Sequence, residues 1–175
     1  MSALTILLLT AVSLPALIFD VTTGKIPNLL TFAGLGAGIL TAVITGGPAA
    51  LPACLAGIFL PFLLLWPLFV LRMMGGGDIK LLMALGGLTG YPGIVRLCVF
   101  SVLAGSVLAV GRMLTTKSFA SRLRRFTNYI RDMAATDRLS RYPGTGDREA
   151  RLPFAAPVFM GTVLYVLNVL QPWQA

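Results

Sequence analysis

The sequence predicts an all-α, polytopic membrane protein. Of its residues 57% are hydrophobic and only 11% are charged, and the mean hydropathy is +0.87. A soluble domain carries about a quarter charged residues. At roughly 20 residues per membrane crossing, the chain length suits about six transmembrane helices and one sizeable loop. We interpret residues 1–175 as a single membrane-embedded domain.

Six apolar stretches are the expected spans. All should be helical, because lipid offers backbone polar groups no partner outside their own segment. The first stretch has no basic flank and no small-residue cleavage site, so we expect a retained span and not a signal peptide. The stretches cover residues 2–19, 28–45, 49–71, 79–90, 93–111 and 153–170.

The distribution of Lys and Arg predicts the orientation, because short basic loops stay in the cytoplasm. Lys25 follows the first span, Arg72 and Lys80 flank the connection after the third, and residues 112–152 hold ten basic against four acidic residues. The alternate connections, residues 45–48 and 87–93, carry no charge. Both termini are therefore expected outside, with the long loop between spans five and six in the cytoplasm.

The basic loop contains one predicted amphipathic helix. Its apolar residues recur at alternating spacings of four and three, which is one helical face. We expect this helix to lie on anionic lipid. Nucleic acid is not an expected partner, because no aromatic platform or base-reading motif accompanies the charge. The apolar face comprises Phe119, Leu123, Phe126, Ile130 and Met133, and the polar face Arg124, Arg125, Asn128 and Arg131.

Asp20 and Asp78 are the only acidic residues at the ends of spans. Two complete crossings separate them, so both should lie at the cytoplasmic side. Ionisable groups at membrane depth are costly and mark functional sites by default. The plainer alternatives are that Asp78 only caps a helix and that Asp20 is an interfacial polar residue.

Three glycines, residues 75–77, precede Asp78. Glycine permits backbone conformations closed to other residues and leaves space for a second chain. The span that follows, from Asp78 to Gly90, rises only about 18 Å against roughly 30 Å of hydrocarbon. A recessed acid beside bare backbone suits a site that admits a peptide.

These residues resemble the type IV prepilin peptidases, which are membrane aspartic proteases of the GxGD type. The resemblance rests on "GGGDIK" at 75–80, on Asp20 followed by "KIPN" at 25–28, and on "RLPFAAPVFMG" at 151–161, which looks like the start of the family's last span. It implies that Asp20 and Asp78 are the catalytic pair. The supporting motif residues would be Gly75, Gly77, Lys25, Pro27, Asn28 and Lys80.

The resemblance also implies a function: cleavage of a prepilin's leader peptide at the cytoplasmic face of the bacterial inner membrane, without a metal or cofactor. Larger members resemble this chain but add a cytoplasmic insertion with paired cysteines and methylate the new N-terminus. Here residues 20–27 form a turn too short for that module. We therefore expect peptidase activity alone, as in the compact members that serve Flp-type or tight-adherence pili and pseudopilins.

Two carboxylates suit peptide hydrolysis on chemical grounds as well. Close acids share one proton, so the charged member can activate water while the neutral member polarises the scissile carbonyl. Helix dipoles predict the roles: Asp20 would follow the end of a helix and act as the acid, and Asp78 would precede the start of a helix and act as the base. Histidine is absent and Cys54 and Cys98 are isolated, which disfavours His triads and zinc hydrolysis.

Three alternatives stay open. Serine–lysine hydrolysis would need Lys25 or Lys80, which are expected to be loop anchors. A small proton- or cation-coupled transporter could use the acids, although transport sites lie near the midplane and no internal repeat is apparent. A noncatalytic assembly factor of a pilus or secretion system could use the basic loop as a docking surface. Asp-to-Asn substitutions distinguish these from a peptidase.

Overall fold

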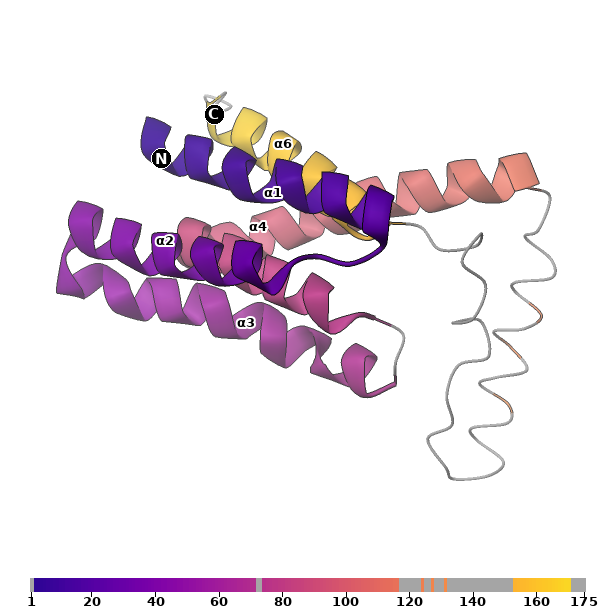
Figure 1. Cartoon of the computed structure of the whole chain (residues 1–175), viewed down its shortest axis with the longest axis horizontal. Coiled ribbons are helices and arrows are strands. Elements are labelled where there is room, and N and C mark those ends of the chain that lie inside the picture. The colour runs from indigo at the N-terminus through magenta and orange to yellow at the C-terminus, as the bar shows by residue number, and fades with distance from the viewer. Residues whose placement is uncertain are drawn as a thin grey trace, which may run out of the picture.

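The structure is a computed structural model that describes residues 2–71, 74–116 and 153–170, together with the single positions 124, 127 and 131. In these ranges all regular structure is helical, as predicted. The helices are α1 (Ala3–Thr23), α2 (Asn28–Gly46), the short 3-10 helix η1 (Pro48–Ala50), α3 (Leu51–Val70), α4 (Gly76–Thr116) and α6 (Ala155–Leu170). Figure 1 shows them as a bundle of roughly antiparallel elements.

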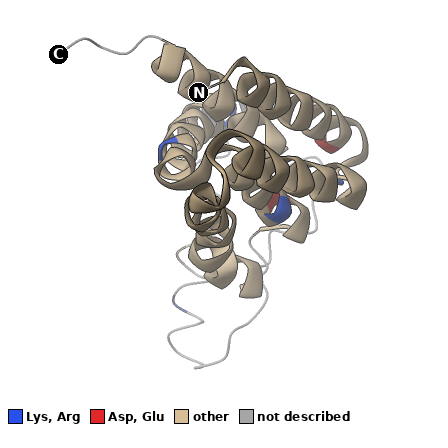
Figure 2. Cartoon of the chain, turned by 90° about the vertical axis from the view of Figure 1, so that its left-hand side faces the viewer, with Lys and Arg blue, Asp and Glu red and all other residues tan. Residues whose placement is uncertain are grey.

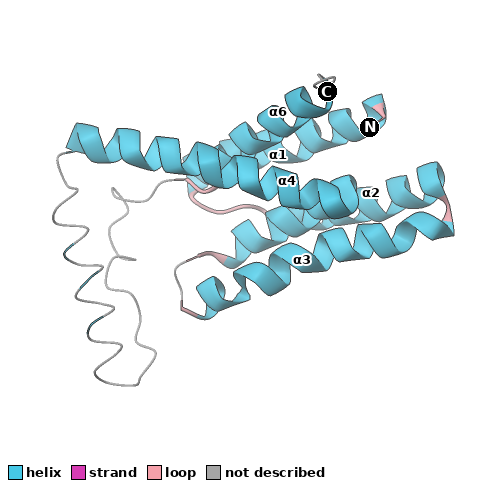
Figure 3. Cartoon of the chain, turned by 180° about the vertical axis from the view of Figure 1, so that it is seen from behind, coloured by secondary structure: helices cyan, strands magenta, loops and turns pink. Residues whose placement is uncertain are grey.

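Helix α4 consists of two halves that run in opposite directions. The helix is broken at Gly90, with φ 61° and ψ −178°, and at Tyr91. A positive φ favours glycine, which explains the residue at this turn. The first half pairs antiparallel with α3, since Gly76 lies near Phe69 and Gly90 near Ala53. The second half pairs with α6 and returns to the starting end, as Figure 3 shows from behind. The break agrees with the predicted boundary between residues 79–90 and 93–111.

Four described helices are long and apolar enough to cross a membrane: Ala3–Thr23, Asn28–Gly46, Pro48–Val70 and Gly76–Arg112. Ala155–Leu170 is a shorter apolar helix. Large apolar side chains cover the outside of the bundle, for example Leu29 at 81% and Leu63 at 74% exposed, which is the pattern of a lipid-facing surface. Figure 2 shows few charged residues on the helices. The sequence of the protein and these helices together indicate a membrane protein; six crossings with both termini outside stay a prediction.

The first half of α4, residues 76–89, forms the centre of the bundle. Leu81, Ala84 and Leu85 are fully buried there, with α2 packed against Ala84 and Gly87 and α3 against Gly86 and Gly87. A helix of this length rises about 20 Å against roughly 30 Å of hydrocarbon. The predicted short fourth span is therefore a short central helix surrounded by longer ones.

Most of the basic loop lies outside the described residues. Arg124, Thr127 and Arg131 are described, and each is helical and exposed. Their spacing of three and four places them on one helical face, which includes two of the predicted polar residues. The predicted apolar face lies outside the described residues, and lipid binding by the loop stays a prediction.

The orientation can be tested with reporter fusions. Fusions after Lys25, Gly76 and Thr136 are expected to report cytoplasmic, and fusions after Gly47 and Gly90 to report the outside, because basic loops are retained in the cytoplasm. The measurement is the ratio of alkaline phosphatase to fluorescent-protein signal for each fusion. A Gly76 fusion that reports outside while Lys25 reports inside would contradict a shared site for the two acids.

Candidate active site

Asp20 lies inside the last turn of α1. The helix continues to Thr23 and ends at Gly24, whose φ of 65° is left-handed and whose amide donates to the Asp20 carbonyl oxygen at 3.0 Å. Glycine favours this C-terminal cap. The expectation that Asp20 follows the end of the helix is therefore wrong by one turn, and its partly buried side chain projects from the helix surface.

The carboxylate of Asp20 binds the start of α6. The backbone N–H of Ala155 donates to Asp20 Oδ2 at 2.8 Å. Ala155 is the first residue of α6, and the amides of a first helical turn have no acceptor within their own helix. Asp20 therefore caps a helix that begins far along the chain. The family resemblance selected the segment 151–161 that contains Ala155, and Pro153 is typical of a helix start, but nothing in the sequence pairs this segment with Asp20.

Asp78 lies inside the first turn of α4. The prediction that it precedes the helix is therefore wrong by a few residues. The amide of Gly75 donates to Asp78 Oδ2 at 3.2 Å, and the amide of Asp78 donates to the Gly75 carbonyl oxygen at 3.2 Å. An acid three residues after the capping position commonly reaches back in this way. Asp78 is therefore not the N-cap residue of the plainer interpretation; it is the third residue of α4 and binds back to Gly75 at the N-cap position. This capping contact does not exclude a catalytic role.

The two acids share one feature of their surroundings. Each carboxylate accepts a backbone amide at the N-terminal end of a helix, where the dipole favours negative charge. The predicted division into acid and base rested on opposite helix ends. Asp20 does lie in the last turn of α1 and Asp78 in the first turn of α4, but Asp20 also accepts an amide from the start of α6. The helix dipoles therefore no longer separate the two acids, and the division of roles stays a prediction.

Contacts between α2 and α4 place both acids at one end of the bundle. Lys80 Nζ donates to Asn28 Oδ1 at 3.0 Å, and the ammonium lies 5.5 Å from the Phe32 ring centroid. Lys80 therefore faces α2. One connection, residues 24–27, joins the end of α1 to the start of α2, so Asp20 lies at the same end. Phe32 was not predicted from the sequence.

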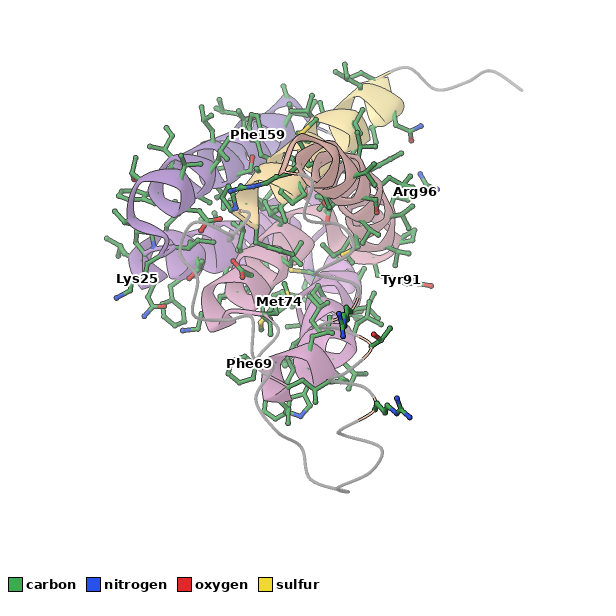
Figure 4. The ribbon with its side chains drawn as sticks, turned by 90° about the vertical axis from the view of Figure 1, so that its right-hand side faces the viewer. Lys25, Phe69, Met74, Tyr91, Arg96 and Phe159 are labelled. Carbon is green, nitrogen blue, oxygen red and sulfur yellow. The ribbon has the colours of Figure 1, made fainter. Side chains whose placement is uncertain are left out.

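The remaining motif residues lie at the same end of the bundle as the two acids. A Cβ built on Gly77 would lie 3.5 Å from Cβ of Ile26, which is ordinary contact distance. Pro27 caps α2, because its carbonyl oxygen accepts the Leu30 amide at 3.2 Å. Lys25 is exposed and points away from the helices in Figure 4, whereas Met74 packs against the core.

The three glycines before Asp78 do not use an unusual backbone. Positive φ among described glycines occurs at Gly24, Gly47 and Gly90, and not at residues 75–77. Gly76 and Gly77 are helical, so the expectation of a special conformation there is wrong. Their contribution is the lack of side chains beside Asp78, with Phe69 covering Gly76 at 3.4 Å from a built Cβ.

Both cysteines are free and lie within the helix packing. Cys54 is buried and its thiol donates to the Gly87 carbonyl oxygen at 3.4 Å, and Cys98 packs against the core from the second half of α4. In the part of the chain that the structure describes, no three His, Cys, Asp or Glu side chains gather into a group that could hold a metal ion.

The fold and site define a helical membrane protein with two acids held at helix starts at one end of the bundle. The profile of the type IV leader peptidase family matches residues 6–110, which include both acids, and the chain belongs to this family.

Curated relatives agree with this family. Two prepilin leader peptidase/N-methyltransferases, from Aeromonas salmonicida strain A449 and from Aeromonas salmonicida, are each 30% identical over 131 residues. The match covers 71% of this chain and 45% of each relative, so the chain spans under half their length. No solved structure matches the chain significantly.

The Lys80–Asn28 contact can be measured by a double-mutant cycle. Lys80→Met and Asn28→Ala are each expected to lower the free energy of unfolding by about 0.5–1.5 kcal/mol, the usual net worth of one hydrogen bond. The double variant should lose less than the sum, because both changes remove the same bond. Unfolding in detergent micelles followed by circular dichroism measures all three variants. Strict additivity would show that the contact contributes nothing.

Proposed function

We propose that this protein is an aspartic endopeptidase that removes the leader peptide of a type IV or Flp-type prepilin or pseudopilin. The single observation that carries the proposal is the pair of acids, Asp20 and Asp78, each fixed by a backbone amide at the same end of a membrane-type bundle. The family and the relatives named as prepilin leader peptidases support the substrate class.

The chemistry follows from the two carboxylates. One takes a proton from water, which attacks the scissile carbonyl carbon, and the other donates a proton to the carbonyl oxygen. The tetrahedral intermediate then collapses: the C–N bond breaks, the leaving nitrogen takes the proton from the first carboxyl, and the hydroxyl proton of the intermediate returns to the second. The amides that hold Asp20 and Asp78 restrict the carboxylates to defined positions, so little reorganisation is needed when the peptide binds. The mechanism requires no covalent intermediate.

The proposed site faces the cytoplasm of a bacterial inner membrane. Lys25 and Lys80 belong to the same end as the acids, and basic residues favour the cytoplasmic side. A prepilin whose leader precedes a hydrophobic helix would present its scissile bond at this level.

We further propose that the activity is peptidase alone. The structure joins α1 to α2 through residues 24–27, so no inserted module lies between them. Cys54 and Cys98 lie within apolar helices and do not form the paired set that accompanies the methyltransferase insertion of larger members.

The test is cleavage by purified protein of prepilins encoded in the same genome. Loss of the leader is read by mass spectrometry of the pilin, which also reveals whether the new N-terminus carries a methyl group. Leader loss without methylation is the expected result. No cleavage of any prepilin by the folded protein would contradict the proposal, and methylation would contradict the peptidase-only assignment.

A further inference from the structure

Asp20 receives its hydrogen bond from a helix outside both acidic motifs. The Ala155 amide, which donates to Asp20 Oδ2 at 2.8 Å, lies 135 residues away in the chain. The distance is within the range of charge-assisted bonds, which are shorter and stronger than neutral ones. Asp78, in contrast, is held by Gly75 of its own helix start.

The start of α6 is anchored independently of Asp20. The Ala156 amide donates to the Pro153 carbonyl oxygen at 3.2 Å, and Ala155 and Val158 are fully buried. Proline at 153 has a fixed φ, which stiffens the turn. The Ala155 amide is therefore a fixed donor, and the Asp20 side chain is the more mobile partner in this contact.

Packing against α4 fixes α6 further along its length. A Cβ built on Gly105 would lie 3.2 Å from Pro157 Cβ, and Gly161 lies directly on Ser101, so the two helices contact closely. Asp78 belongs to the first half of α4 and Gly105 to the second. The position of Asp20 relative to Asp78 thus depends on how α6 sits against α4.

We propose that the backbone amide of Ala155 is a positioning group for Asp20 in catalysis. It fixes Oδ2, so that the carboxylate keeps one orientation toward the peptide and toward Asp78. This inference rests on the proposed function and extends it by making α6, through an atom that no side-chain substitution removes, part of the catalytic arrangement.

The decisive variant removes the donor and leaves every side chain unchanged. Cell-free translation of the full chain into nanodiscs can replace Ala155 with L-lactic acid, which keeps the methyl group and exchanges the N–H for an ester oxygen. We expect kcat for leader cleavage to fall by roughly tenfold to a hundredfold with KM unchanged, since small misplacement of a reacting group has effects of this size. The matched control replaces Ala156, whose amide bonds Pro153 and not Asp20.

A second measurement reports the bond without needing activity. Asp20→Asn keeps an oxygen that can accept the Ala155 amide, whereas Asp20→Ala does not. Hydrogen exchange at the Ala155 amide is expected to be roughly tenfold or more faster in Asp20→Ala than in Asp20→Asn, because only the former leaves the amide without an acceptor. The Ala156 amide should exchange equally in both variants.

The outcomes separate the two proposals. Equal kcat for the Ala155 and Ala156 esters overturns the positioning role while leaving the peptidase intact. Equal exchange at the Ala155 amide in Asp20→Ala and Asp20→Asn overturns the hydrogen bond itself. This measurement does not use the ester, so it decides the question even if the Ala155 ester fails to fold. Absence of cleavage by the unmodified, folded protein overturns the proposed function, and the exchange comparison still decides whether α6 holds Asp20.

Discussion

Replacing either Asp20 or Asp78 with Asn is expected to slow leader cleavage by about 10²- to 10⁴-fold, which is the usual contribution of a positioned general acid or base. Asn keeps a side-chain oxygen that can accept the amide of Ala155 or of Gly75, so both helix starts stay capped. The loss therefore reports proton transfer and not unfolding. Cleavage by the purified variants is followed by mass spectrometry.

Two controls accompany these variants. Asp137→Asn changes an acid of the predicted loop and is expected to retain full activity. Asp20→Ala and Asp78→Ala should lose activity and also about 1 kcal/mol of stability, because each removes a cap. Retained cleavage by Asp20→Asn or Asp78→Asn would remove that residue from the catalytic pair. An assembly factor, in contrast, would support pilus formation with either substitution.

The helices were predictable because each corresponds to an apolar stretch of the sequence. The predicted stretch 28–45 became Asn28–Gly46, and 153–170 became Ala155–Leu170. Lipid permits only structures that satisfy their own backbone groups, so hydrophobicity and length decide the element. The break at Gly90 was also expected, because glycine and proline interrupt helices and Gly90 is followed closely by Pro92 and Gly93.

Helix ends at the candidate site were harder to predict. Asp20 falls within α1 because Gly24 supplies a left-handed cap one turn later, and Asp78 falls within α4 because it reaches back to Gly75. Both shifts are only a few residues, and each acid stays at the expected end of its own helix. What the sequence did not reveal is that Asp20 also accepts an amide from the start of α6. Hydropathy does not detect such caps, which depend on single hydrogen bonds.

Long-range partners could not be derived from local patterns. The motif residues Asn28 and Lys80 were selected by resemblance, but their direct bond appears only when α2 lies beside α4. The Ala155 amide was missed because backbone donors carry no sequence signature. What the sequence identifies well is the chemistry of side chains; what it leaves open is which helix holds each one.

Gly57→Ala and Gly86→Ala are expected to be the most destabilising single-methyl changes in the bundle. Gly57 of α3 and Gly86 of α4 face each other so closely that a Cβ on either would overlap the carbonyl oxygen of the other. The obstruction is backbone, which cannot rotate away as a side chain would. Small residues allow such close approach between membrane helices. Overpacking typically costs about 1–3 kcal/mol, and the backbone contact places these variants at or above the upper end.

The same contact links stability to the candidate site. Separating α3 from the first half of α4 would displace the central helix that carries Asp78, so cleavage should fall together with stability. Gly36→Ala is the matched control, because a Cβ there meets nothing within 4 Å and alanine favours a helix more than glycine. Unfolding by sodium dodecyl sulfate in mixed micelles measures each variant. If Gly57→Ala and Gly86→Ala unfold at the same detergent fraction as Gly36→Ala, α3 and α4 do not approach as closely as this packing requires.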